Sequence, residues 1–287
     1  MLTAEEIKAY LHRIGICDIE SPTRSFLFAL HRAHVTNVPW ETVDIYAGRS
    51  VSIDVNASIA HILRGRSGYC FHLNGAFSIL LRALGYQVFL HRAGVQPRGE
   101  DPRINSFHVG MTVNLLNEAG EKEIWIADVG LGDMPYEPLP LKAGEYLQGP
   151  FLYKVAASSV APNGWRLEHD PTASFVGVDV APEVVHDMGT FRTNHEYYSI
   201  SADSPWMNVF LVRQRNAVGS FELRGCMLSE RNSSGIVKSE LQFKTQWLDA
   251  LGDIFGERLV DYDSIERDAL WKRVYRSHEE WKKTNMK

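Results

Sequence analysis

The first 86 residues carry apolar side chains at the spacing of buried helix faces. Thr3 and Glu6 have the spacing of a capping box, which opens an amphipathic helix. From Cys70 to Gly85, apolar residues recur at i, i+3, i+4 and i+7, and a glycine after such a run is typical of a left-handed cap. The pattern predicts four helices, over residues 3–15, from 21 onward, over 56–65 and over 70–85.

After Gly85 the hydrophobic period shortens from about 3.6 toward 2 residues, which indicates strands. Turn signals such as Asn163-Gly164 separate some of these strands. Helical spacing returns around Trp247 and again from Ile265. We therefore expect an α+β chain in which a helical unit is followed by a mainly antiparallel sheet or barrel. The predicted strands cover residues 87–95, 107–113, 123–129, 151–155, 165–167, 210–213 and 221–228.

Composition narrows the range of partners. The chain has 287 residues, of which 45% are hydrophobic and 23% charged, as in ordinary soluble globular proteins. A net charge of −5 does not suggest binding to nucleic acid or to a membrane surface, so we expect a small-molecule or protein partner. The N-terminus has no basic segment followed by an apolar one, and no run approaches the ~18 apolar residues of a membrane span. We expect a cytoplasmic chain.

The three cysteines, Cys17, Cys70 and Cys226, lie far apart and have no metal-ligand spacing, so we expect neither a disulfide framework nor a structural zinc site. Cys70 differs because the flexible turn Ser67-Gly68 delivers it to the start of an apolar helix. The helix dipole and the unpaired N–H groups there favour a thiolate and lower the thiol pKa from about 8.5 toward neutrality. The alternative is a buried, inert cysteine.

A cysteine nucleophile needs a base within hydrogen-bond reach and a third group that orients the base. His72 is nearest in sequence, but two residues along a helix its side chain points about 200° away from that of Cys70. His108 lies on the less apolar face of a predicted strand, and Asp128 ends another strand that is otherwise apolar. A buried carboxylate needs a partner, and an imidazolium suits it. The alternatives are a structural histidine at 108 and a turn cap at Asp128.

Three short patterns resemble the arylamine N-acetyltransferases in residue type, order and spacing. Cys70 follows Arg-Ser-Gly-Tyr and precedes Phe-x-x-Asn-Gly, His108 lies 38 residues further on, and Asp128 lies 20 residues after that, within Ala-Asp-Val-Gly-Leu-Gly. Further landmarks extend the resemblance over most of the chain: Leu30-His31-x-x-His34, Pro39-Trp40-Glu41, Gly48-Arg49, Leu84-Gly85-Tyr86 and Ser204-Pro205-Trp206.

Four residues depart from the family pattern. Ser67 and His72 stand where the family usually has Gly and Glu, and Trp40 and Leu131 stand where Phe is usual. None of these changes removes a member of the expected triad. They concern acceptor preference and the charge near Cys70.

The resemblance implies three domains on a core like that of cysteine proteases and transglutaminases. These are a helical bundle over residues 1–86, an antiparallel β-barrel over 87–205 and an α/β lid over 206–287. The bundle would carry Cys70, and the barrel would carry the other two members of the triad.

The resemblance also implies a reaction. Cys70, His108 and Asp128 would form a catalytic triad, and acetyl-CoA would be the acetyl donor. The acceptor would be the nitrogen of an arylamine, arylhydrazine or hydrazide, or the oxygen of an N-hydroxyarylamine. The reaction would follow a ping-pong course through an acetyl thioester on Cys70. We expect no metal, and a monomer or a homodimer.

The same resemblance places four side chains around the acceptor: Trp40, Val95, Leu131 and Trp206. For each, the alternative is an ordinary core position. The chain has no dinucleotide-binding GxGxxG motif and no Walker loop. We therefore expect the phosphates or pantetheine of acetyl-CoA near Gly130 and Gly132, whose exposed amides could form an anion nest. A simple tight turn is the alternative.

Two other kinds of function fit the same residues. One keeps the triad and changes the chemistry, as in a cysteine hydrolase, a transglutaminase-like enzyme or an amide synthase that releases a polyketide from a carrier protein. The other is a non-catalytic binding module in which Cys70, His108 and Asp128 form only a polar network.

Overall fold

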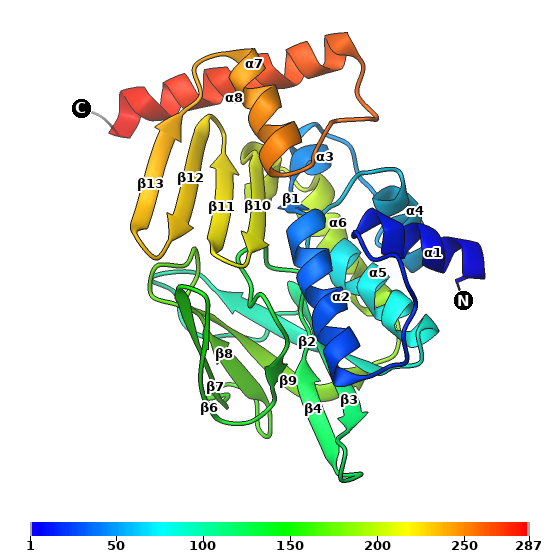
Figure 1. Ribbon diagram of the computed structural model, residues 1–287. Helices are drawn as coiled ribbons and strands as arrows, with labels where there is room; N and C mark the ends of the chain where they lie inside the picture. Colours follow the sequence, from blue (N-terminus) through cyan, green and yellow to red (C-terminus); the bar gives the residue numbers. More distant parts are fainter. Residues whose placement is uncertain (1, 286–287) are drawn as a thin grey trace.

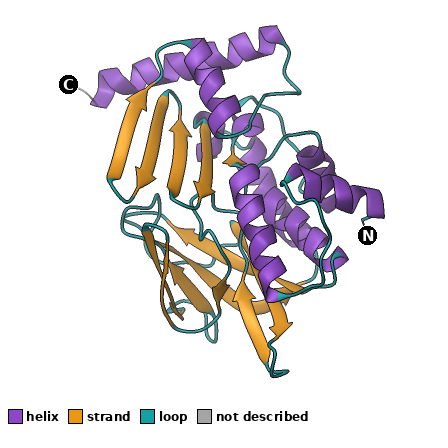
Figure 2. Cartoon of the chain, in the orientation of Figure 1, coloured by secondary structure: helices purple, strands orange, loops and turns teal. Residues whose placement is uncertain are grey.

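The computed structural model describes residues 2–285, and helices precede, separate and cover two β-sheets (Figure 1 and Figure 2). All four helices predicted in the first part of the chain are present, and α1 begins at the predicted capping box of Thr3 and Glu6. The one-turn helix α3 was not predicted. The N-terminal helices are α1 (Ala4–Arg13), α2 (Arg24–Asn37), α3 (Val43–Tyr46), α4 (Val55–Leu63) and α5 (Cys70–Ala83).

Eight antiparallel strands form the larger sheet, in the order β5-β4-β3-β2-β9-β8-β7-β6. The edge strands β5 and β6 are joined by residues 141–143 alone, so the two edges are separated by at most about 14 Å of chain. The sheet therefore curls back on itself, and the predicted antiparallel barrel is confirmed as a near-barrel. Its strands are β2 (Gln87–Gln96), β3 (His108–Leu116), β4 (Lys122–Ile126), β5 (Leu139–Pro140), β6 (Gly144–Gln148), β7 (Phe151–Ala157), β8 (Trp165–Glu168) and β9 (Gly177–Val185).

The smaller sheet has the order β1-β10-β11-β12-β13 and combines distant parts of the chain. Its edge strand β1 (Trp40–Glu41) precedes α3, whereas the other four strands follow residue 210. The predicted strand over 221–228 is wrong, because a turn at Gly225, with φ +60, divides that segment into two paired strands. The four later strands are β10 (Leu211–Asn216), β11 (Gly219–Arg224), β12 (Met227–Asn232) and β13 (Gly235–Glu240).

Helices pack against this smaller sheet and between the two sheets. Near the C-terminus, α7 (Lys244–Asp249) continues into the π turn η3 (Ala250–Ile254) and is followed by α8 (Ser264–Asn285). These elements and the sheet share one hydrophobic cluster around Trp247. No helix in the described chain combines the length and the apolar character needed to cross a membrane. The connection from β9 to β10 contains three elements that were not predicted: η1 (Met188–Phe191), α6 (Arg192–Ile200) and η2 (Pro205–Asn208).

Helix α5 packs between the other N-terminal helices and the near-barrel sheet (Figure 1). Eleven of its 14 residues are buried. Such a helix cannot shift or rotate without disturbing close packing on several sides. Residues at its first turn, including Cys70, are therefore held in a fixed position.

A buried ion-pair cluster ties the start of α5 to the C-terminal part of the chain. The side chain of Arg66 has no exposed surface, and its Nη2 lies 3.0 Å from Asp44 Oδ2 of α3. Its Nη1 lies 2.5 Å from Oε1 of Glu257, which follows η3 and is also completely buried. Burial raises the pKa of Glu257, and the positive charge of Arg66 opposes this rise. Either side chain left alone would be an uncompensated buried polar or charged group.

Replacing Glu257 by Gln tests this cluster. Glu257→Gln should lower the free energy of unfolding by about 3 kcal/mol, at the low end for a broken buried pair because Asp44 still neutralises Arg66. The matched control is Glu168→Gln, which removes an exposed pair with Lys154 and should cost less than about 1 kcal/mol. Urea unfolding of the three proteins gives the comparison. Equal stabilities of the two variants would contradict the assigned importance of the buried pair.

Candidate active site

Cys70 is the first residue of α5 and lines a cavity of about 310 Å³. All four residues expected around the acceptor also line it: Trp40, Val95, Leu131 and Trp206. The rings of Trp40 and Trp206 meet edge to face with centroids 5.4 Å apart, and those of Phe107 and Tyr198 lie 4.5 Å apart. The cavity is therefore lined largely by aromatic rings with the thiol in its wall, a lining that suits a flat aromatic molecule.

Most of the side chains that line the cavity are apolar, and the charged ones among them are positive. Three arginines line it: Arg103, Arg213 and Arg224. No carboxylate is found among the described residues of its lining.

The three residues of the expected triad lie together. His108 Nε2 is 2.5 Å from Asp128 Oδ2. The Cys70 Sγ lies 3.8 Å from the carbonyl oxygen of Phe107, the residue before His108, and both Cys70 and His108 line the cavity. The other ring nitrogen, His108 Nδ1, is buried without a hydrogen-bond partner in the described chain. It is the nitrogen that remains for proton exchange with a thiol or a bound molecule.

Asp128 lies two residues beyond the end of β4, so the prediction that it ends a strand is wrong. In this loop its Oδ1 accepts hydrogen bonds from Asn74 Nδ2 at 2.7 Å and from the Gly130 N–H at 2.8 Å. Burial favours the neutral acid, but the charge of His108 and these hydrogen bonds outweigh it and hold the pKa of Asp128 below its usual value. Asp128 thus caps its own turn and also orients His108.

Asn74 is the functional side chain that sequence reasoning missed. It lies four residues after Cys70, on the same side of α5. Its Nδ2 donates to Asp128 and, at 2.7 Å, to the carbonyl oxygen of Val109, while its Oδ1 accepts from the Val129 N–H at 2.9 Å. The Phe-x-x-Asn-Gly pattern contained this residue. No role followed from it, because its partners are 35 to 55 residues away in the sequence.

Two glycines allow the loop after Asp128 to pack closely. A Cβ on Gly130 would lie 2.9 Å from the Cα of Cys70, and one on Gly132, with φ +78, would lie 2.5 Å from the Cβ of Arg213. Gly130 is buried and its N–H is already bonded to Asp128. The expectation that Gly130 offers an exposed amide to acetyl-CoA is therefore wrong, whereas a contact of Gly132 with acetyl-CoA stays a prediction.

The environment of Cys70 does not favour a free thiolate. Burial raises the pKa of the Cys70 thiol and the negative charge of Asp128 acts in the same direction, whereas N–H groups of Phe71 and Val109 lower it. The expectation that the helix start alone brings this pKa toward neutrality is wrong, because loss of water outweighs the helix dipole. A thiolate can form here when its proton passes to His108, so that an ion pair replaces two neutral groups.

His72 points away from the cavity that contains Cys70. Its Nε2 lies 3.1 Å from the carbonyl oxygen of Val51, and its side chain lines a separate small space behind Tyr69. Burial lowers the pKa of His72 to about 3, so the ring is neutral near pH 7. This position agrees with its exclusion as the base, and a neutral His72 adds no charge near Cys70.

Among residues 2–285, two groups of side chains have ligand atoms close enough for a metal ion. In the first, Glu41, Asp44 and His61 converge, but the guanidinium of Arg66 lies 3.0 Å from Asp44 and already supplies a positive charge there. In the second, on the surface, Glu240 pairs with His278 and Lys282. Neither group lies in the cavity that contains Cys70.

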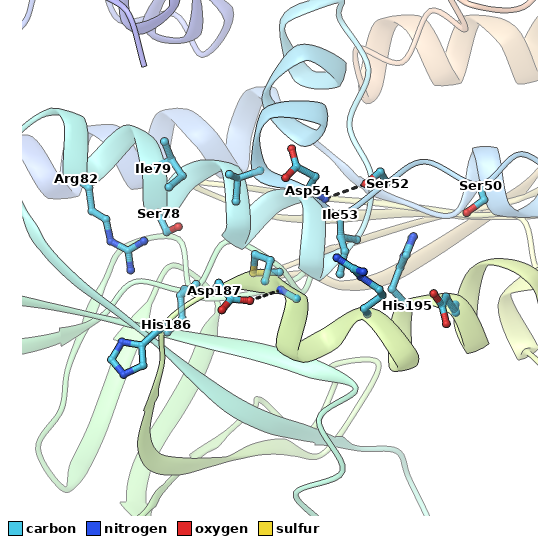
Figure 3. A pocket seen from close by; sticks show the side chains of 16 residues that line it. Ser50, Ser52, Ile53, Asp54, Ser78, Ile79, Arg82, His186, Asp187 and His195 are labelled. Atoms are coloured by element: carbon cyan, nitrogen blue, oxygen red, sulfur yellow. Dashed lines mark hydrogen bonds between the residues drawn. The ribbon is translucent and has the colours of Figure 1, made fainter. Parts of the chain in front are cut away.

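A larger cavity of about 610 Å³ lies on the other side of α5, between residues 50–55 and the η1–α6 segment (Figure 3). Its lining includes Arg82 and two carboxylates, Asp54 and Asp187, so its charges are mixed. It contains no member of the expected triad. We therefore assign the active site to the smaller cavity.

Comparison with known proteins agrees with this geometry. The family model described as N-acetyltransferase matches residues 25–263. The arylamine N-acetyltransferase / N-hydroxyarylamine O-acetyltransferase of Salmonella typhimurium is 29% identical over 66% of this chain and 67% of its own. The solved arylamine N-acetyltransferase of Mycobacterium abscessus superposes with a TM-score of 0.81 at 25% identity, covering 94% of both chains.

A second solved structure bears on the donor. The Mycobacterium marinum arylamine N-acetyltransferase in complex with CoA superposes with a TM-score of 0.79, covering 93% of this chain and 98% of its own, at 23% identity. At that identity the likeness concerns the fold. Together with the match over residues 25–263, these findings confirm the resemblance, and the chain belongs to the arylamine N-acetyltransferase family.

Proposed function

We propose that this chain transfers an acetyl group from acetyl-CoA to the nitrogen of an arylamine, arylhydrazine or hydrazide, through an acetyl thioester on Cys70. The observation that carries the proposal is the buried His108–Asp128 pair beside a cysteine in the wall of an aromatic cavity. The Salmonella relative is also an N-hydroxyarylamine O-acetyltransferase, which supports transfer to the oxygen of N-hydroxyarylamines. All residues of the proposed site come from one chain, so a monomer would be sufficient.

The first half-reaction forms the acetyl-enzyme. Cys70 passes its proton to His108 Nδ1, and the thiolate attacks the acetyl carbonyl carbon of acetyl-CoA. The bond between that carbon and the CoA sulfur breaks, and His108 returns the proton to the departing CoA thiolate. Because one thioester replaces another, the exchange is nearly isoenergetic. The N–H groups at the start of α5 are the donors for the oxyanion that forms on the carbonyl oxygen.

The second half-reaction uses the same base. The acceptor nitrogen attacks the acetyl carbon on Cys70, the carbon–sulfur bond breaks, and His108 carries the proton from nitrogen to the Cys70 sulfur. Asp128 keeps Nε2 of His108 protonated, so that Nδ1 faces this chemistry as the acceptor. Trp40, Val95, Leu131 and Trp206 would hold the flat acceptor in the cavity.

Incubation with acetyl-CoA alone tests the nucleophile. One acetyl group should appear on Cys70, visible by intact mass and located by peptide mapping, because the acetyl-enzyme persists until an acceptor arrives. Cys17→Ser should still be acetylated, whereas Cys70→Ser should not. Acetylation of Cys17 instead, or rapid release of acetate from the wild type, would contradict the proposal and favour a hydrolase.

Replacing Asp128 by Asn tests the orienting carboxylate. Asp128→Asn should lower acetyl transfer by about three to four orders of magnitude, because an amide can favour the wrong tautomer of His108. Asp203→Asn, at an exposed position, is the matched control. Turnover by a folded Asp128→Asn protein at the rate of this control would remove Asp128 from the mechanism.

Asn74 is proposed as a positioning residue, since it touches Asp128 and not the reacting atoms. Asn74→Ala should lower kcat by about 100-fold with a small change in KM, because misplacement of His108 affects the chemical steps. The control is Asn117→Ala, in an exposed turn. A large rise in KM at unchanged kcat would instead assign Asn74 to substrate binding.

A further inference from the structure

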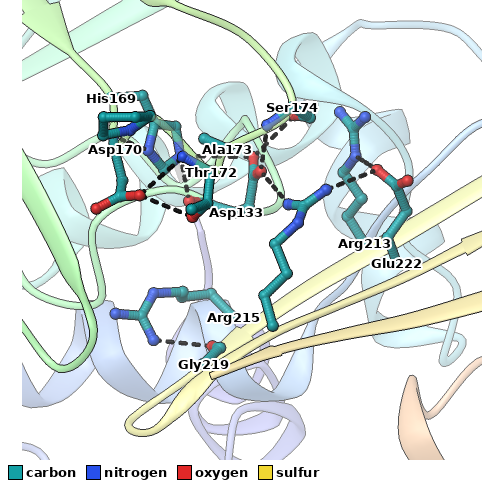
Figure 4. A network of polar contacts seen from close by, with 12 residues as sticks. Asp133, His169, Asp170, Thr172, Ala173, Ser174, Arg213, Arg215, Gly219 and Glu222 are labelled. Carbon is teal, nitrogen blue, oxygen red and sulfur yellow. Dashed lines mark hydrogen bonds and ion pairs between the residues drawn. The ribbon is translucent and has the colours of Figure 1, made fainter. Parts of the chain in front are cut away.

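A series of alternating positive and negative side chains lies beside the active-site cavity. It connects the loop after Gly132 to the smaller sheet (Figure 4). Asp133 Oδ2 is 3.0 Å from Arg231 Nη1 of β12. Arg231 Nη2 lies 3.8 Å from Glu222 Oε2 of β11, and the same oxygen accepts a hydrogen bond from Arg213 Nε of β10 at 2.7 Å. The proposed mechanism uses none of these four residues.

Of these four charged residues, Arg213 is the one that lines the cavity. It is the cross-strand partner of Trp40, so the two side chains lie on the same face of the sheet, and both line the cavity. Its guanidinium carbon is 5.6 Å from the centre of the Trp40 ring. Only 12% of the side chain is exposed, which places a guanidinium in a largely dehydrated position.

The terminal nitrogens of Arg213 are free to bind a ligand. Glu222 accepts a hydrogen bond only from the Nε of Arg213. In Figure 4 the Nη1 and Nη2 atoms point away from that carboxylate. Neither donates a hydrogen bond to any residue within the described part of the chain. Two parallel N–H donors of one guanidinium match the two oxygens of a carboxylate.

The other two arginines of the cavity are less suited to this task. Arg103 is 38% exposed and pairs with Glu100, and Arg224 is exposed. Water weakens a charged hydrogen bond at such positions, whereas a nearly buried donor such as Arg213 discriminates more strongly.

Arg213 and Cys70 are linked through the loop that follows Asp128. Gly130 packs against Cys70, and Gly132 packs against Arg213. Each contact is so close that a side chain with a Cβ would not fit at the glycine. These two loop residues are separated by at most about 7 Å, and the side chains of Cys70 and Arg213 line the same cavity.

We propose that Arg213 is a specificity residue that binds an anionic group on the acceptor, so that the chain prefers aromatic amines or hydrazides that carry a carboxylate. This inference rests on the proposed acetyl transfer. An anionic oxygen could also come from the phosphates of acetyl-CoA. The two half-reactions separate these sources, since acetyl-CoA takes part only in the first and the acceptor only in the second.

The test compares 4-aminobenzoate with its neutral isostere 4-aminobenzamide. Acetylation of Cys70 by acetyl-CoA is measured first, and deacetylation of the acetyl-enzyme by each acceptor is measured second. The wild type should favour the acid. Arg213→Gln should lower kcat/KM for 4-aminobenzoate by about 10- to 100-fold, mainly through KM, with little effect on 4-aminobenzamide. Arg213→Lys keeps the charge without the paired donors and should fall between the two.

Arg224→Gln removes an exposed arginine from the same cavity and should leave the ratio of the two acceptors unchanged. Turnover of the neutral amide by Arg213→Gln reports that this variant is folded. Equal losses for both acceptors, no preference in the wild type, or a raised KM for acetyl-CoA in the first half-reaction would overturn the proposal. Absence of any acetyl group on wild-type Cys70 would instead refute the acetyl transfer itself.

Discussion

The arrangement of the active site depends on one buried carboxylate. Asp128 accepts hydrogen bonds from Asn74 of α5, His108 of β3 and the N–H of Gly130 in its own loop. An ionised carboxylate left without these donors would carry a large desolvation cost, so the three elements must meet at this point for the chain to fold. The same contacts fix the orientation of His108. The contacts of Asp128 therefore hold α5 against the near-barrel sheet and orient the base at the same time.

The cavity exists only because the smaller sheet is held against the rest of the molecule. Its walls come from β1, β2, α5, the α6–η2 segment and β10, which are far apart in the sequence. Two ion-pair clusters hold the C-terminal part in position. Arg66 and Glu257 tie it to the start of α5, and Arg231 and Asp133 tie it to the loop that follows the triad. A change in either cluster would reach the site through its walls, even though neither cluster touches Cys70.

Burial sets both the reactivity and the selectivity of this site. Burial in an apolar cavity raises the pKa of the Cys70 thiol, so transfer of its proton to His108 is the route to a thiolate. The same low water content strengthens any hydrogen bond from a guanidinium at its edge. Neutral His72, despite its proximity in sequence, affects neither process because it lies on the other side of the helix start.

The sequence by itself determined the longer helices at both ends of the chain, several of the strands and the proposed triad. These depend on local periodicity, as in α5, or on residue types at characteristic spacings, as for Cys70, His108 and Asp128. It could not give the split of residues 221–228 into two strands, the pairing of Trp40 with Arg213, or the roles of Asn74 and Arg66, because their partners lie dozens to hundreds of residues away. Only the tertiary structure decided that the N–H of Gly130 donates to Asp128 and that burial raises the pKa of the Cys70 thiol. Both follow from burial and long-range contacts, which a local pattern of residues does not contain.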